Sequence, residues 1–176
     1  KEAAKRGLSN LATTPEAMAS FLSKKNIELV TKHRIFTEAE FRARCEIQME
    51  TYIKTINIEA LTSIDMIRHQ ILPAALRYSE QLTRSILNKK EVGITCRAER
   101  NLVRRLSDAC DKLYDLCEQL GNDLKKVPAD TAKAAAYYGT VIVDHMAKAR
   151  EQADILESLT DKTLWPYPTY SDLLFY

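Results

Sequence analysis

The feature that most constrains this chain is one apolar stripe that runs from Thr37 to about Asn88. Hydrophobic side chains recur there every three or four positions, the spacing that keeps them on one face of an α-helix. The stretch Thr37–Glu40, preceded by Phe36, has the pattern of a capping box with a hydrophobic staple, so the helix is predicted to begin there. The stripe comprises Phe41, Cys45, Met49, Tyr52, Ile56, Ala60, Ile64, Ile67, Ile71, Ala75, Tyr78, Leu82 and Ile86.

Glycine and proline mark the expected ends of the helices. The chain has only four glycines and five prolines, and we interpret them as standing where helical periodicity stops, which predicts an all-α fold. Pro73 is an exception because it falls inside the long stripe. A proline removes one amide donor and clashes with the carbonyl four residues back, so we expect a kink near His69–Pro73.

Three further helices are predicted around the long one. A short helix begins with Thr14 as N-cap and Pro15 at the first helical position. After a turn at Gly93, a second further helix carries a near-heptad seam of leucines. The last helix begins at Ala129 or Asp130. The seam comprises Leu102, Leu106, Ala109, Leu113, Leu116, Leu120 and Leu124.

These elements predict an antiparallel helical bundle, because short connections favour antiparallel neighbours. It contains one long kinked helix, a two-helix hairpin and an aromatic, extended C-terminal tail. We expect a linker with short N-terminal helices over residues 1–36, the bundle over 37–162 and a docked tail over 163–176. Together they form one domain, and a chain that begins at Lys1 is expected to be a fragment of a longer one.

Composition argues against several classes of partner. Twenty-six Lys and Arg against twenty-four Asp and Glu leave a formal charge of +2, so neither nucleic acid nor a membrane surface is an expected partner. No apolar run reaches the roughly 18 residues of a membrane span. Four cysteines without C-x-x-C spacing favour a reducing cytosol, so the expected location is cytoplasmic.

No catalytic, cofactor-binding or metal-binding residue is predicted within this chain. Cys110 and Cys117 lie two turns apart on one helix, roughly 10 Å, which is too far to share a metal directly, and buried cysteines are the better interpretation. The three histidines lack metal-ligand spacing, and the chain has no phosphate-binding glycine loop.

Two patterns are candidates for contacts. Arg97, Arg100 and Arg104 fall within about 60° on a helical wheel, where they form either a solvated face or a contact for an acidic partner. The stretch from Asn57 to Met66 mixes polar and apolar residues, which predicts a helix covered on two sides with its polar groups bonded to neighbours.

The last fourteen residues, TLWPYPTYSDLLFY, are unusually aromatic for a chain end. Pro166 and Pro168 are expected to hold this tail extended, which lowers the entropic cost of docking. The tail either covers the bundle's own core or docks on another domain or subunit. Its candidate contact residues are Trp165, Tyr167, Tyr170 and Phe175.

Several stretches resemble the C-terminal region of type III glutamine synthetases. These are RGLSNLATTPEA, the long FTEAEFRARCEIQMETYIKTINIEALTSIDMIRHQILPA, and LWPYPTYSDLLF near the end. The joint occurrence of KTINIEA and WPYPTYSDLLF is the specific part of this match. The leucine seam between them would suit any bundle.

The resemblance implies a parent enzyme that joins ammonia to glutamate with ATP and magnesium in a large ring-shaped oligomer. It implies that this chain is the noncatalytic helical extension, with the preceding catalytic domain and neighbouring subunits as partners. The family's catalytic groups belong to that preceding region, so none is carried over to these positions. The alternative interpretation is an independent helical interaction module that uses the arginine face.

Overall fold

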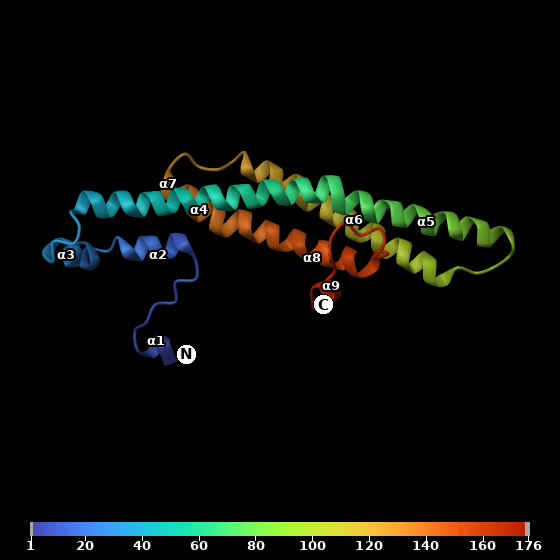
Figure 1. Ribbon diagram of the computed structural model, residues 1–176, viewed down its shortest axis with the longest axis horizontal. Helices are drawn as coiled ribbons and strands as arrows, with labels where there is room; N and C mark the ends of the chain where they lie inside the picture. The colour runs from blue at the N-terminus through green and yellow to red at the C-terminus, as the bar shows by residue number, and fades with distance from the viewer. Residues whose placement is uncertain (1, 175–176) are drawn as a thin grey trace. The chain divides into compact units, whose positions relative to one another are not determined.

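A computed structural model describes residues 2–174, and every regular element in that part of the chain is a helix (Figure 1). The all-α prediction is therefore confirmed. The chain separates into two compact units, Lys1–Glu59 with Asp123–Asp144 and Ala60–Asn122 with His145–Tyr176. The predicted boundaries at residues 37 and 163 remain predictions.

The first unit contains the N-terminal helices, the beginning of the long helix and the start of the last long helical segment. Its core includes Phe41, Cys45, Tyr138 and Ile142, each at most 5% exposed. Its elements are α1 (Glu2–Lys5), α2 (Thr14–Phe21), α3 (Lys24–Lys32), the first part of α4 (Glu38–Met66), α7 (Thr131–Tyr137) and the π-helical turn η2 (Tyr138–Ile142).

The start of α4 matches the sequence prediction. The Thr37 amide donates to Glu40 Oε2 at 2.8 Å, and the Glu40 amide donates to Thr37 Oγ1 at 3.3 Å, which completes a capping box. The hydrogen bond from the Thr37 amide lowers the pKa of the Glu40 carboxyl. Phe36 stacks on Phe41 with ring centroids 6.2 Å apart, so the hydrophobic staple is also confirmed.

The predicted start of the first short helix is displaced by one residue. Thr13, and not Thr14, is the N-cap of α2, and the Glu16 amide donates to Thr13 Oγ1 at 3.4 Å. The Glu16 carboxylate accepts from the Thr13 amide in return, at 3.3 Å. Only Thr13 stands three residues before Glu16, so only Thr13 can complete this reciprocal pair.

Two glycines lie inside helices, which corrects the expectation that glycine marks the helix ends. Gly121 is within α6 (Arg97–Leu124) and Gly139 within η2. A Cβ on Gly139 would lie 3.2 Å from the Tyr52 hydroxyl and 3.6 Å from Pro15 Cγ. Gly139 is therefore needed for close approach between helices and not for a turn.

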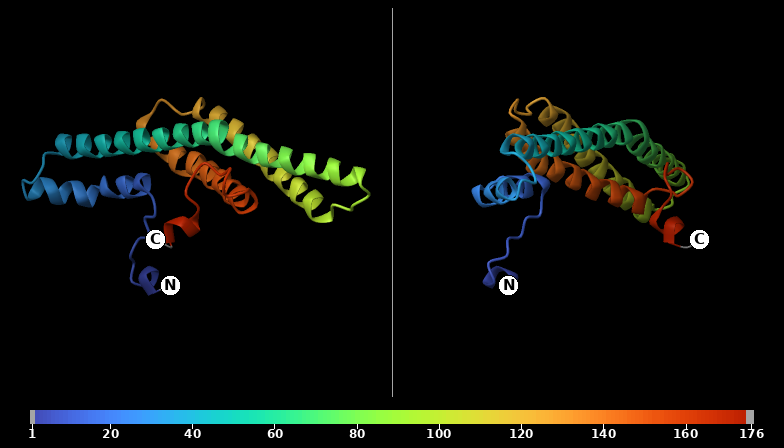
Figure 2. Two further views of the ribbon diagram at one scale, coloured as in Figure 1. Left: turned by 45° about the vertical axis from the view of Figure 1, so that its right-hand side comes forward. Right: turned by 60° about the vertical axis from the view of Figure 1, so that its left-hand side comes forward.

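The second unit is built from the rest of the long helices. In it α5 and α6 run antiparallel, joined by residues 92–96 (Figures 1 and 2). An ion pair between Lys89 and Glu99 links the two helices near this connection. Leu106, Leu113 and Leu120 of the predicted seam are fully buried. The elements are the end of α4, the π-helical turn η1 (Ile67–Ile71), α5 (Leu72–Glu91), α6, α8 (Val143–Leu159) and α9 (Tyr170–Leu174).

The distortion predicted near His69–Pro73 is present, but as a π-helical turn. The Leu72 amide donates to the Ile67 carbonyl, five residues back, and α5 continues directly from Leu72. Proline lacks the amide that would bond four residues back, and the wider turn just before it accommodates that loss.

Arg34 adopts a left-handed backbone, with φ of 56°. It ends α3 where the Ile35 amide donates back to the Val30 carbonyl at 3.0 Å, the position that glycine usually occupies. We expect Arg34→Gly to raise the free energy of unfolding by about 0.5–1 kcal/mol, because glycine has no Cβ to strain this conformation. Urea denaturation followed by circular dichroism measures the change.

Arg34→Ala is the matched control, since it removes the exposed side chain but keeps Cβ. Its stability is expected to stay within about 0.5 kcal/mol of the parent chain. An alanine variant as stabilised as the glycine variant would contradict the backbone explanation.

Candidate binding site at the C-terminal tail

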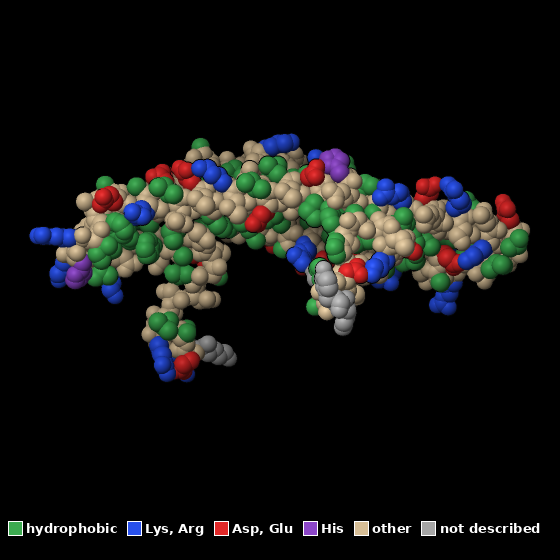
Figure 3. All heavy atoms as spheres, viewed as in Figure 1, with side chains coloured by type: hydrophobic (Ala, Val, Ile, Leu, Met, Phe, Trp, Pro, Cys, Tyr) green, Lys and Arg blue, Asp and Glu red, His purple; other side chains and the backbone are tan. Residues whose placement is uncertain are grey.

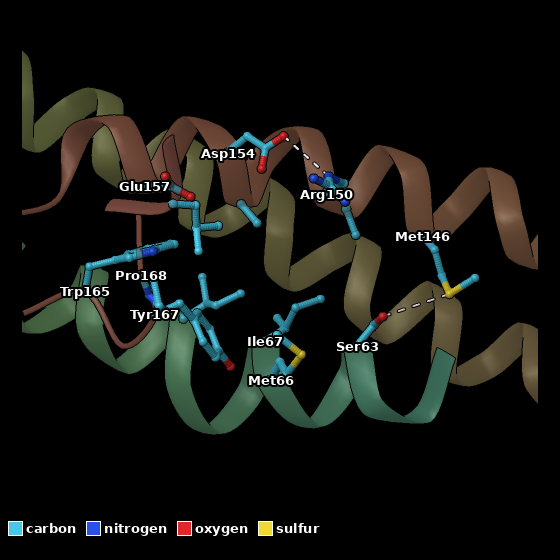
Figure 4. Close-up of a pocket in the computed structure, with 14 residues that line it drawn as sticks. Ser63, Met66, Ile67, Met146, Arg150, Asp154, Glu157, Trp165, Tyr167 and Pro168 are labelled. Carbon is cyan, nitrogen blue, oxygen red and sulfur yellow. Dashed lines mark hydrogen bonds and ion pairs between the residues drawn. The ribbon is translucent and has the colours of Figure 1, made fainter. Parts of the chain in front are cut away.

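A cavity of about 380 Å³ lies within the second unit, between α8, the α4–η1 segment and the tail. We call it the tail cavity. Figure 4 shows α8 on one side, with Met146, Arg150, Asp154 and Glu157, and the α4–η1 segment on the other. The residues that line it are Ser63, Met66, Ile67, Ile71, Met146, Ala149, Arg150, Ala153, Asp154, Glu157, Trp165, Tyr167, Pro168 and Leu173.

Small and apolar side chains make the interior of the tail cavity. Ala149 and Ala153 are one turn apart on α8, and both line it. Ile67 and Ile71, from the π-helical turn, line it from the other side. Alanine leaves room where a larger residue would fill the space between helices, and π-helical turns are frequent at functional sites.

The chain reverses after α8 through a tight turn that brings the tail back to the helices. Asp161 organises this turn, since its carbonyl accepts from the Leu164 amide at 2.9 Å and from the Trp165 amide at 3.1 Å. Its carboxylate accepts from the Thr163 amide at 2.7 Å. Trp165 is consequently only 8% exposed, so the tail docks on the chain's own helices at this residue.

The end of the tail is helical and not extended, which corrects one prediction. Irregular backbone in the tail covers residues 165–169, and α9 begins at Tyr170. The Thr169 amide donates to Asp172 Oδ2 at 2.9 Å, and the Asp172 amide donates to Thr169 Oγ1 at 3.3 Å. This capping box starts a helix that the sequence analysis overlooked, although its Thr-x-x-Asp pattern is visible.

Asp172 also fastens the tail to the preceding turn. Its carboxylate forms an ion pair with Lys162. The Lys162 side chain and the hydrogen bonds from Thr169 lower the pKa of the Asp172 carboxyl to about 2. The carboxylate is therefore charged at neutral pH and holds both ends of the tail's irregular segment.

Two hydrogen-bond donors in the wall of the tail cavity have no partner. Trp165 Nε1 and the Tyr167 hydroxyl are both buried, and neither makes a hydrogen bond. Burial raises the pKa of the Tyr167 phenol, and the nearby Asp65 carboxylate raises it further, so the group stays protonated. A buried donor without an acceptor costs about 1–3 kcal/mol, and such groups require an explanation.

Charged groups surround the opening of the tail cavity. Arg150 and Asp154 form an ion pair on α8, with 3.7 Å between Arg150 Nε and Asp154 Oδ2. Glu157 lies about one turn beyond Asp154 on α8 and also lines the cavity. Among the residues that line the cavity, one cation and two carboxylates give a net negative charge.

Only some of the predicted contact residues lie at the tail cavity. Trp165 and Tyr167 both line the tail cavity, while Tyr170 provides the first backbone position of α9. Phe175 lies outside the described residues. Arg97, Arg100 and Arg104 are all exposed on α6 and do not line the cavity.

The two-sided character predicted for residues 57–66 is only partly confirmed. Asn57 Oδ1 accepts from the Tyr138 hydroxyl at 2.9 Å in the first unit. In the second unit Ser63 and Met66 line the tail cavity. Ile58, in the same stretch, is 63% exposed, so not every apolar residue there is covered. The α8 residues of the cavity were not predicted from the sequence, where their visible signal is the spacing of Ala149 and Ala153.

Cys110 and Cys117 are buried, as predicted. All four cysteines are free thiols, and burial raises the pKa of Cys110 to about 11, with a further contribution from the Asp111 carboxylate. Within residues 2–174 no group of three or more His, Cys, Asp and Glu side chains is arranged to hold a metal. No helix in the same range is long and apolar enough to cross a membrane.

Figure 3 shows basic and acidic side chains interspersed along the α5 end of the molecule. On α5 itself, Arg84 pairs with Glu80 at 2.7 Å. Such exposed pairs contribute little to stability, so this surface gives no specific indication of a ligand.

The fold and the tail cavity define an all-α domain whose aromatic C-terminal segment docks on its own helices. Comparison with known proteins identifies the family: residues 1–90 match the model of the glutamine synthetase C-terminal domain. This match covers just over half of the chain, and the chain belongs to that family.

Named relatives extend the match to almost the whole chain. Glutamine synthetase from Butyrivibrio fibrisolvens is 35% identical over 99% of this chain and 26% of its own length. Type-3 glutamine synthetase from Dictyostelium discoideum is 31% identical over 99% of this chain and 25% of its own length. Glutamine synthetase from Bacteroides fragilis (strain YCH46) is 28% identical over 99% of this chain and 25% of its own length. The chain thus spans about a quarter of the length of these relatives.

Trp165 is the residue that anchors the tail. We expect Trp165→Ala to lower the free energy of unfolding by about 3 kcal/mol, because it removes a large buried side chain and leaves a cavity. Urea denaturation measures the loss. Leu174→Ala, at a tail residue that is 73% exposed, is the control and should change stability by less than about 0.5 kcal/mol. Equal stability of both variants would rule out this anchoring role.

Proposed function

We propose that this chain is the noncatalytic C-terminal structural and assembly domain of a type III glutamine synthetase. The parent enzyme makes glutamine from glutamate, ammonia and ATP, with magnesium, as a cytoplasmic homo-oligomer. In this proposal the parent's catalytic domain supplies the chemistry, and the helices described here supply contacts to that domain and to neighbouring subunits.

The observation that carries this proposal is the coverage of the relatives. Nearly all of this chain aligns with only about a quarter of proteins named glutamine synthetase, and the matching family model is that of their C-terminal domain. The side chains described here supply contact surfaces: a docked tail with a cavity beside it and an exposed arginine face.

The test begins with the native polypeptide that carries this sequence, captured with an antibody raised against residues 1–176. We expect its intact mass to be several times the 20.1 kDa of this chain, and the purified protein to form glutamine from glutamate and ammonia only when ATP and magnesium are present. A native species near 20.1 kDa would favour the independent helical interaction module.

The arginine face on α6 is the proposed contact for an acidic surface of another domain or subunit. Combined Arg97→Glu, Arg100→Glu and Arg104→Glu substitutions in the parent are expected to raise the subunit dissociation constant about tenfold, because like charges then meet at the contact. Analytical ultracentrifugation at several salt concentrations measures this change, since screening weakens such contacts.

Stability should change by no more than about 0.5 kcal/mol per substitution, since all three arginines are exposed. Lys112→Glu, at another exposed position on α6, is the control for a nonspecific change in charge. Unchanged assembly of the triple variant would assign the arginines to an ordinary solvated face.

A further inference from the structure

We propose that the tail cavity is a docking site for an apolar peptide segment from the part of the parent polypeptide that this chain does not cover. The occupant inserts one or two apolar side chains and offers uncharged backbone carbonyls to the wall. This inference rests on the proposed function, because it takes its occupant from the same polypeptide.

The size and lining of the cavity match a small occupant. Its 380 Å³ falls within the range of about 300–1,000 Å³ found for ligand pockets, and such pockets are mainly apolar with a few polar groups. A whole helix, about 10–12 Å across with its side chains, is too large for this space. Met66, Ile67 and Met146 offer apolar contacts, and methionine adapts to side chains of different shape.

The unpartnered donors indicate what polar group the occupant carries. Trp165 Nε1 donates only, and the Tyr167 hydroxyl is protonated, so both can bond to an acceptor. They lie two residues apart in irregular backbone between α8 and α9. A peptide segment has a carbonyl at every residue and can supply such acceptors without carrying charge.

The charge of the rim selects against a free anion. Asp154 and Glu157 both line the cavity, and Arg150 forms an ion pair with Asp154. Bringing a further carboxylate beside these two is unfavourable, because like charges repel. An uncharged amide carbonyl satisfies the donors without that cost, which favours a peptide over a small organic acid.

The tail has to shift for the acceptors to reach both donors, because the two polar atoms are covered in the present arrangement. The flanking attachments allow such a shift without unfolding α8. On one side the Asp161 turn holds residues 163–165, and on the other the Thr169–Asp172 capping box holds α9. Docking therefore tightens a segment whose ends are already fixed, which lowers its entropic cost.

The source of the segment follows from chain length. The relatives are about four times as long as this chain, which covers 25–26% of each. Most of a parent polypeptide of that size lies outside the present sequence, and attachment to the same polypeptide gives a docking segment a high effective concentration.

Photo-crosslinking in the complete parent protein tests this proposal. p-Benzoylphenylalanine in place of Asp154, an exposed residue of the rim, is irradiated and its crosslinked peptides are identified by mass spectrometry. We expect a crosslink to a segment of the parent outside these 176 residues. The same group in place of Ala147, exposed on α8 and not part of the cavity lining, is the position control and should not give that crosslink.

Two further substitutions connect the crosslink to the cavity. Ala153→Phe, added to the rim variant, fills the cavity and is expected to reduce the crosslink yield at least about tenfold, since it excludes the side chain of the occupant. Tyr167→Phe removes one donor and keeps the ring, so the yield at limiting occupancy should fall about fivefold. Circular dichroism establishes that each variant retains its helices.

Several outcomes would overturn the proposal. These are crosslinks confined to this chain, crosslinks to a separate protein, no crosslink, or a yield that Ala153→Phe leaves unchanged. Glutamine formation is assayed on the same preparations. An active parent without the crosslink overturns only the docking site, whereas an inactive parent with the crosslink supports docking and overturns the proposed enzymatic function.

Discussion

Burial of one apolar face along each long helix of the second unit is the interaction on which its other features depend. Leu106, Leu113 and Leu120 of α6 are each 0% exposed, and Ile67 and Ile71 of η1 are buried as well. Each such side chain contributes about 1.5–3 kcal/mol when it is fully removed from water. The tail can dock only because these contacts first hold the surface that Trp165 covers.

The start of α4 and the buried seam of α6 were predictable because they depend on local patterns. A capping box needs two residues three apart, as Thr37 and Glu40 are, and the seam needs only helical spacing. The same locality explains the error at α2: the predicted cap at Thr14 ignored Glu16, which selects Thr13. Likewise, the spacing of Thr169 and Asp172 indicates the start of α9, but the adjacent prolines led to the prediction of an extended tail.

The tail cavity was not predictable, because it depends on contacts between segments distant in the sequence. Nothing in the local pattern brings Ala153 of α8, Ile67 of η1 and Trp165 of the tail to one place. Periodicity identifies a buried face but not its neighbour, and a small residue such as alanine can either allow close helix packing or leave a space. Gly139 shows the first outcome, with Tyr52 and Pro15 at close range.

The cavity combines a surface that is already rigid with a wall that can still adjust. Regular helices α4 and α8 fix two sides, while the third side, residues 165–168, has no regular backbone hydrogen bonding and is fixed only at its ends. Leaving Trp165 Nε1 and the Tyr167 hydroxyl unpaired opposes docking of the tail, yet burial of the Trp165 ring outweighs that cost. An occupant that supplies acceptors would remove the penalty and keep the ring buried. The same two side chains can therefore anchor the tail and recognise a peptide.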